Sequence, residues 1–185
     1  MGSTAAEAPL RVACIAGSTR EGRSGTDVVR WFAGVLAERE DLGATMVDLA
    51  DFDFPARYPR QPTPEMRRFT AELARAEAFV VVTPEYNHSF PASLKQAIDY
   101  GYDEWHAKPV GFVSYGCGSC GLHAVEQLRA VFTELHAVTV RDVAGVDLFG
   151  TDDGRRDRTA HALLDQLAWW GRALRDARAA RPYVA

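Results

Sequence analysis

Short apolar runs alternate with amphipathic segments along almost the whole chain, and this alternation most restricts the fold. The runs LRVACIA (10–16) and AFVVVT (78–83) have no polar face, which is typical of strands buried on both sides of a parallel sheet. Between them, apolar residues such as Val28, Phe32 and Val35 recur at helical spacing. The pattern predicts a doubly wound α/β domain in which helices cover both faces of a parallel sheet.

Five strands and five helices are expected in alternation. The predicted strands span 10–16, 44–49, 78–83, 109–115 and 137–143, and each is expected to be apolar on both faces. The predicted helices start at the cap residue Thr26, at Glu65, near Pro91, near Gly121 and near Arg158, and the last ends near Arg178. Within that last helix, Trp169 and Trp170 are expected in the core and its packing surface. A single domain over 10–180 follows a flexible tail of residues 1–9.

Composition narrows the classes of function. The chain has 185 residues, 47% of them hydrophobic, and a formal net charge of −4, which is ordinary for a globular domain and disfavours nucleic acid as an obligate partner. The three cysteines, Cys14, Cys117 and Cys120, are too few and too unevenly placed for a disulfide framework and favour a cytoplasmic location. Since a membrane span requires about 18 apolar residues in a row, no membrane partner is expected.

Ligands of doubly wound sheets bind beyond the carboxyl ends of the strands, so the loops after strands one, three and four are the candidate site. The first, GSTREGRSG (17–25), combines glycines with Arg20 and Arg23 at the start of a helix, which favours a phosphate dianion. It nearly matches the triphosphate loop GxxxxGK[ST]. Arg23 replaces the lysine, however, and no Asp follows the third strand, so an NTPase is disfavoured.

The other two loops favour a flat redox ligand. TPEYNHSFP (83–91) is stiffened by prolines and offers Tyr86 as a stacking face. GCGSCG (116–121) also satisfies the dinucleotide fingerprint GxGxxG, with Asp142 about 20 residues further on. Only one further strand follows, which disfavours a complete dinucleotide-binding domain.

Three motifs in this order resemble the flavodoxin-like NADPH-dependent FMN reductases, a family that includes quinone, azo-dye and chromate reductases. They are GSTREGRSG, PEYNHSFPASLKQAIDY and SYGCGSCGLHAVEQLR, after strands one, three and four. The resemblance extends from Arg11 to about Leu174. It implies a five-stranded parallel sheet in the order 2-1-3-4-5, FMN as cofactor and NADPH as electron donor.

The resemblance also implies which residues contact the cofactor. In the first motif they hold the FMN phosphate, in the second they line the isoalloxazine, and in the third they close over its pyrimidine end, where the following helix would stabilise the negative charge of reduced flavin. These residues are Ser18, Arg20, Arg23, Ser24, Gly25 and Thr26, then Pro84, Glu85, Tyr86 and Asn87, and finally Ser114, Tyr115 and Gly116.

The third motif departs from the family pattern, because Cys117 and Cys120 replace glycines and His123 replaces an arginine. A Cys-Gly-Ser-Cys sequence at a helix start is expected to lower a thiol pKa and would suit a reversible dithiol, although both cysteines could equally be tolerated small residues. No metal site is expected, since one CxxC leaves a zinc tetrahedron half empty. Cys14 is expected in the core. The histidines at 106, 136 and 161 show no ligand spacing and are expected on the surface.

By this resemblance, hydride passes from NADPH to FMN and then to a small-molecule electron acceptor such as a quinone, a free flavin or an azo compound, in a ping-pong cycle. No catalytic side chain is required, although Tyr86 and His88 are possible acceptor contacts. Three alternatives stay open: an FMN-binding electron carrier without NADPH activity, a flavin-assisted dithiol enzyme using Cys117 and Cys120, and a flavin-free binding module.

The resemblance further implies a homodimer or homotetramer, with FMN near the subunit contact and residues of the helix that runs through Ile98 and Tyr100 on the interface. The sequence itself places three aromatic residues, Tyr100, Tyr102 and Trp105, beside the expected site.

Overall fold

The computed structural model describes residues 8–151 and 154–185, so the expected tail of residues 1–9 lies almost entirely outside the described residues. Strands and helices alternate as the sequence predicts. The strands are β1 (Leu10–Ala16), β2 (Leu42–Asp48), β3 (Ala78–Pro84), β4 (Pro109–Gly116) and β5 (Val138–Asp147). The helices are α1 (Gly25–Ala37), α2 (Pro64–Arg75), α3 (Ala92–Tyr100), α4 (Leu122–Glu134) and α5 (Arg155–Ala180), with short 3-10 turns at Leu49–Asp51 and Asp103–Trp105.

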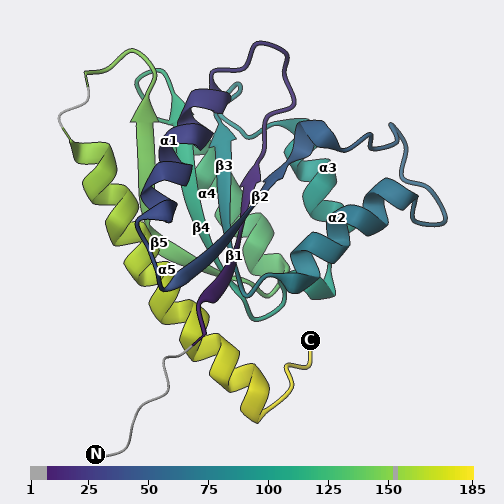
Figure 1. Ribbon diagram of the computed structural model, residues 1–185. Helices are drawn as coiled ribbons and strands as arrows, with labels where there is room; N and C mark the ends of the chain where they lie inside the picture. Colours follow the sequence, from purple (N-terminus) through teal and green to yellow (C-terminus); the bar gives the residue numbers. More distant parts are fainter. Residues whose placement is uncertain (1–7, 152–153) are drawn as a thin grey trace, which may run out of the picture.

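The five strands form one parallel sheet in the order β2-β1-β3-β4-β5, which confirms the predicted flavodoxin-like topology (Figure 1). The chain runs from β1 outward to β2, then returns to the other side of β1 for β3. The strand order therefore reverses between β1 and β3, and the carboxyl ends of β1, β3 and β4 lie side by side at one edge of the sheet.

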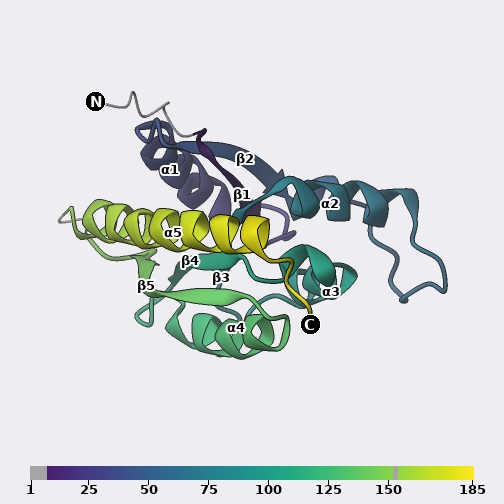
Figure 2. The same ribbon diagram turned by 90° about the horizontal axis from the view of Figure 1, so that it is seen from below.

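Two apolar cores, one on each face, hold the helices against the sheet. Helices α1 and α5 cover one face and α2, α3 and α4 the other, as the alternating strand residues dictate (Figure 2). Phe79 and Phe112 point toward the three-helix face, whereas Val80 and Val113 point toward α1 and α5. Cys14 lies in the second core, as expected, and burial raises the pKa of its thiol to about 12.

Not every strand is apolar on both faces. β2 starts two residues earlier than predicted, and four of its seven residues are exposed, including Met46. The reason is its place at the edge of the sheet, where little of a helix covers it. β5 is likewise half-covered and extends to Asp147 rather than 143, past a register shift opposite Val110 and Phe112. Periodicity in the sequence does not distinguish an edge strand from a central one.

The helix starts differ most from the predictions at α1 and α5. Thr26 is not the cap of α1: Ser24 occupies that position and its side chain makes no capping hydrogen bond. The last helix starts at Arg155, three residues before the predicted Arg158. None of the helices in the described ranges is both long and apolar enough to cross a bilayer.

Trp169 and Trp170 are not in the core, since these residues are 64% and 38% exposed. α5 crosses the sheet at Gly171, where an added Cβ would lie 2.3 Å from the Leu10 side chain. Because of this close approach, the face of α5 that carries Gly171, Leu164 and Leu167 packs on the sheet. The indoles of Trp169 and Trp170 lie on other faces of the helix and point outward.

Other aromatic and imidazole groups also lie elsewhere than expected. Ile98, Tyr100 and Trp105 are buried in the core of this one chain, and only Tyr102 of the predicted aromatic group is exposed. His106 is not on the surface either, because its side chain is 11% exposed and packs against His136.

Candidate cofactor site

The three predicted loops converge at the carboxyl edge of the sheet. The Gly17 N–H donates to the Val82 carbonyl at 2.8 Å, and the Glu85 N–H donates to the Tyr115 carbonyl at 3.0 Å. These bonds continue the β1·β3 and β3·β4 ladders one residue past the strands. Each loop therefore starts from a fixed position at the point where the strand order reverses.

The first loop is braced from inside. The Arg23 guanidinium donates to both carboxylate oxygens of Asp48, at the end of β2, and to the Ser18 carbonyl. The hydrogen bond to Asp48 is the main cause that raises the pKa of Arg23. The Arg23 guanidinium is thus largely paired within the protein. Arg20 in the loop, and Ser24 and Thr26 at the start of α1, are exposed.

Gly25 and Tyr115 meet beneath this loop. A Cβ at Gly25 would lie 2.1 Å from the Tyr115 hydroxyl, so only glycine fits there. Tyr115 is 4% exposed, and burial raises its pKa to about 12 despite a hydrogen bond with Ser18. Ser18 is also buried and its Oγ lies 3.1 Å from the Tyr86 hydroxyl. The Ser18 and Tyr86 hydroxyls therefore connect the first loop to the second.

The second loop is a tight turn in which Tyr86 and Ser89 exchange backbone hydrogen bonds of 2.8 and 3.0 Å. Asn87 and His88 occupy its centre with φ of 50° and 63°, a conformation that Asn and His tolerate better than most residues. Gln127 of α4 holds the turn, because its amide donates to the His88 carbonyl at 2.7 Å and its Oε1 accepts from Ser89 Oγ at 2.7 Å.

Glu85 links the second loop to the third. Its Oε2 accepts hydrogen bonds from Ser119 Oγ at 2.9 Å and from the His123 N–H at 3.1 Å, and its Oε1 lies 3.1 Å from His123 Nδ1. Burial alone would raise the pKa of Glu85, but the hydrogen bonds from Ser119 and His123 outweigh it and hold the pKa below its ordinary value. Glu85 is therefore a carboxylate directed toward α4.

The third loop does not activate Cys120 as expected. Burial, followed by the charge of Asp147, raises the pKa of the Cys120 thiol, so the expectation of a lowered pKa is wrong for this residue. Cys120 precedes the helix with φ of 53°, and its Sγ lies 3.8 Å from the Gly118 carbonyl oxygen rather than at the helix N–H groups. Cys117 and Cys120 are both free thiols.

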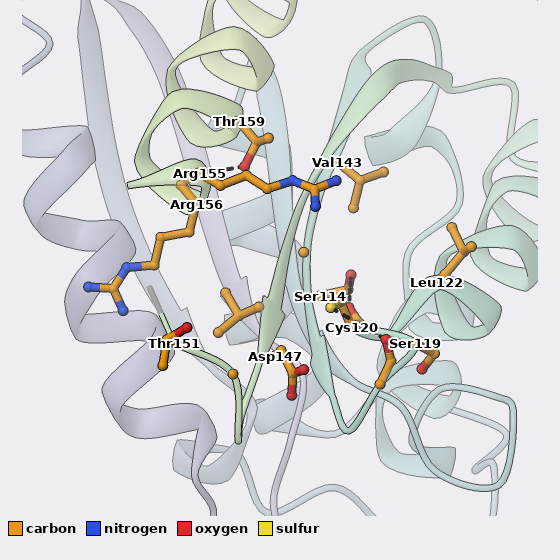
Figure 3. Close-up of a pocket in the computed structure, with 14 residues that line it drawn as sticks. Ser114, Ser119, Cys120, Leu122, Val143, Asp147, Thr151, Arg155, Arg156 and Thr159 are labelled. Atoms are coloured by element: carbon orange, nitrogen blue, oxygen red, sulfur yellow. Dashed lines mark hydrogen bonds between the residues drawn. The ribbon is translucent and has the colours of Figure 1, made fainter. Parts of the chain in front are cut away.

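A pocket of about 710 Å³ opens beside the third loop, between β5 and the start of α5. Ser114, Ser119 and Cys120 line one side, and Arg155 and Thr159 line the other (Figure 3). Of the predicted cofactor residues, only Ser114 lines this pocket, and its Oγ donates to the Cys120 carbonyl at 2.7 Å. The pocket is therefore adjacent to the loops predicted to hold the cofactor rather than between them.

The predicted residues fall into two groups by position. The exposed residues at the start of α1 and the turn around Tyr86 present groups to solvent, whereas Ser114, Tyr115 and Gly25 lie underneath and shape the loops. Sequence reasoning missed Asp48, Ser119 and Gln127, which hold the loops in place. Asp48 alone had a usable signal, since it ends a strand next to β1.

Comparison with known proteins identifies the family. The NADPH-dependent FMN reductase family matches residues 10–150. An NAD(P)H-dependent FMN reductase from Nectria sp is 38% identical over 119 residues, which are 57% of this chain but only 59% of that protein. A quinone reductase from Pseudomonas putida is 32% identical over 86% of this chain and 93% of its own.

Solved structures agree on the fold. FerB from Paracoccus denitrificans, a flavoenzyme NAD(P)H:(acceptor) oxidoreductase, superposes with a TM-score of 0.71 at 18% identity, over 89% of this chain and 98% of its own. On the sheet order, the three loops and the extent of the sequence match, this chain belongs to the NADPH-dependent FMN reductase family.

Proposed function

We propose that this protein is an FMN-dependent NAD(P)H oxidoreductase that transfers hydride from NADPH to a small acceptor such as a quinone in a ping-pong cycle. The observation that carries the proposal is the meeting of the three family motifs at the reversal of strand order, where Glu85, Ser18 and Tyr86 connect the loops. The match to a quinone reductase over 86% of this chain supports the acceptor class.

The residues of the first loop fit a phosphate monoester. No side chain caps α1, so its first N–H groups are not used by a capping oxygen, and the helix dipole favours an anion there. Ser24, Thr26 and Arg20 add exposed donors at the same end. We assign phosphate binding to these residues and to the loop backbone around Gly25, with Arg23 bracing the loop through Asp48.

The other two loops fit a flat ring. Pro84 to Asn87 would line it, largely through backbone held by the turn, while Tyr115 and Gly116 would limit it at the β4 end. FMN held by these residues would supply the hydride chemistry between the nicotinamide and the acceptor. The protein orients the partners, and no general base is required of Tyr86 or His88, which are proposed acceptor contacts.

The test separates an enzyme from an electron carrier. Protein loaded with FMN is mixed anaerobically with NADPH in a stopped-flow spectrometer, and absorbance near the flavin maximum is followed. Rapid bleaching, followed by recovery of the flavin absorbance when a quinone is added, supports the reductase. Parallel lines in double-reciprocal plots of initial rate against NADPH, at several quinone concentrations, support ping-pong order. Bound FMN that NADPH does not bleach identifies a carrier, and failure to bind FMN at all contradicts the cofactor assignment.

We also propose a cytoplasmic homodimer or homotetramer. The free thiols fit a reducing compartment. Since Ile98 and Tyr100 are buried within one chain, we expect any contact made by α3 to use its more exposed residues. Light scattering coupled to size exclusion gives the molar mass, and a monomer at micromolar concentration contradicts the proposal.

A further inference from the structure

Three potential metal ligands meet beside the second loop, although the sequence spreads them over nearly forty positions. Glu85, His88 and His123 each offer one ligand atom, and these atoms all lie within 4.8 Å of one another. Glu85 and His88 come from the loop after β3, whereas His123 comes from the first turn of α4. We infer that Glu85, His88 and His123 form a binding site for a divalent transition-metal ion of the Zn²⁺ class.

The carboxylate is already oriented for this role. Glu85 is 10% exposed, and its Oε2 is occupied by hydrogen bonds from Ser119 and from the His123 backbone. Its Oε1 is left facing His123 Nδ1 at 3.1 Å. Ligand atoms of a tetrahedral zinc ion with bonds of about 2.0 Å lie roughly 3.3 Å apart, so this separation is close to one edge of a zinc tetrahedron. The bonds to Oε2 supply the outer support that oriented metal ligands commonly have.

His88 completes the set from the turn. Its ring is stacked on that of His123 with centroids 4.2 Å apart and an angle of 5° between planes. Because nitrogen lone pairs lie in the ring plane, one ring must rotate about its Cβ–Cγ bond before both can bind one ion. Both imidazoles are exposed, so nothing encloses them against this rotation, and Gln127 meanwhile fixes the backbone of His88.

The ligand chemistry defines the ion. Two imidazoles and one carboxylate suit Zn²⁺, Ni²⁺ or Co²⁺ rather than Mg²⁺ or Ca²⁺, which prefer oxygen ligands only. Three protein ligands leave at least one position for water or another ligand. The inference stands on these side chains and does not depend on the proposed redox activity.

Calorimetry with Zn²⁺ tests the site in the full chain after treatment with a chelator. We expect one ion per chain. His123→Arg keeps a cation beside Glu85 but cannot bind a metal, and His88→Asn removes the imidazole while suiting the positive φ. Each should weaken Zn²⁺ binding more than ~10-fold. Loss of a residue that merely supports a metal ligand already costs about 10-fold in affinity, and these variants remove a ligand itself. His161→Ala removes a comparably exposed histidine outside the cluster and should leave the affinity unchanged.

The thiols of Cys117 and Cys120 are the alternative zinc ligands that the experiment must distinguish from the proposed ones. The Cys117→Ser/Cys120→Ser variant should keep Zn²⁺ binding, because the proposed ligands are intact. Loss of binding in that variant alone assigns the metal to the thiols and overturns the inference, as does the absence of binding to the unmodified chain. Circular dichroism and thermal melting without metal establish that the histidine variants are folded. Anomalous diffraction at the zinc edge then places the ion, and a position away from Glu85 contradicts the site.

Discussion

At the scale of single residues, the candidate site depends on close contacts that admit little change. Gly25 is the sharpest case, because the Tyr115 hydroxyl occupies the space where a Cβ would be. Tyr115 in turn is fixed by burial in the core shared by α1 and α5. The start of α1 and the end of β4 therefore set one another's positions.

Gly25→Ala should destabilise the protein by ~1–3 kcal/mol and weaken FMN binding, because overpacking must displace Tyr115 or the loop. Urea unfolding and fluorescence titration with FMN measure the two effects. Gly34→Ala is the matched control in the same helix: nothing lies within 4 Å of its added Cβ. It should instead stabilise by ~0.5–1 kcal/mol, the usual gain over glycine in a helix. Equal effects at both positions would contradict the packing argument.

The ion pair between Arg23 and Asp48 offers a second residue-scale prediction. By charge alone, Asp48→Ala should strengthen binding of a phosphate dianion. We expect the opposite, a loss of about 1 kcal/mol or ~5-fold in FMN affinity, because the bidentate pair holds the loop in shape. Fluorescence titration measures the affinity. Tighter binding in Asp48→Ala would show that Arg23 acts through its charge rather than as a brace.

At the scale of elements, the loop between β4 and α4 carries Cys117 and Cys120. Its Gly121 has φ of 84°, and a Cβ there would lie 2.6 Å from Ser114 Cβ, which keeps the loop tight. Glu85 ties the loop to the β3 side through Ser119 and His123. The conformation of this loop therefore comes from glycine and from Glu85 rather than from its cysteines.

The Cys117→Ser/Cys120→Ser variant should retain NADPH-dependent quinone reduction within about twofold. The raised pKa of Cys120 keeps this thiol protonated near neutral pH, and a protonated thiol is a poor nucleophile. Initial rates with a quinone, normalised to bound flavin, give the comparison. A large loss of turnover with flavin content unchanged would instead support the dithiol enzyme.

At the scale of the whole molecule, the two edges of the sheet differ in character. The carboxyl edge carries the candidate site, whereas the opposite edge buries a charge. Lys108, just before β4, is 9% exposed, and its Nζ donates to the Leu73 carbonyl of α2 at 3.2 Å. Burial, then the charge of Arg178, lowers the pKa of Lys108 to about 8.

This buried lysine predicts the pH dependence of stability. Between pH 8 and the ordinary value of 10.5, the unfolded chain binds a proton at Lys108 that the folded chain has released. The contribution of Lys108 to the free energy of unfolding therefore rises with pH across this window. Urea unfolding at several pH values should show that Lys108→Met lacks this rise, relative to the unmodified chain. Parallel pH profiles for the two proteins would contradict the assignment.

Sequence determined the architecture because burial on both sides of a sheet requires continuous apolar strands and forces helices to alternate with them. It therefore predicted both ends of β1, β3 and β4 to within one residue, and the three loops that carry the site. Edge exposure in β2 and the outward Trp169 and Trp170 escaped prediction, since they depend on which neighbours cover an element.

Only the tertiary structure decided the contacts between loops. Arg23 with Asp48, and Glu85 with His123, are separated by 25 and 38 positions, and no local pattern pairs them. The glycines, prolines and charges of each loop are read from the local sequence. The partners of those charges depend on the order of the strands in the sheet. Local propensities fix elements, but the juxtaposition of distant side chains depends on the packed sheet that brings their loops to one edge.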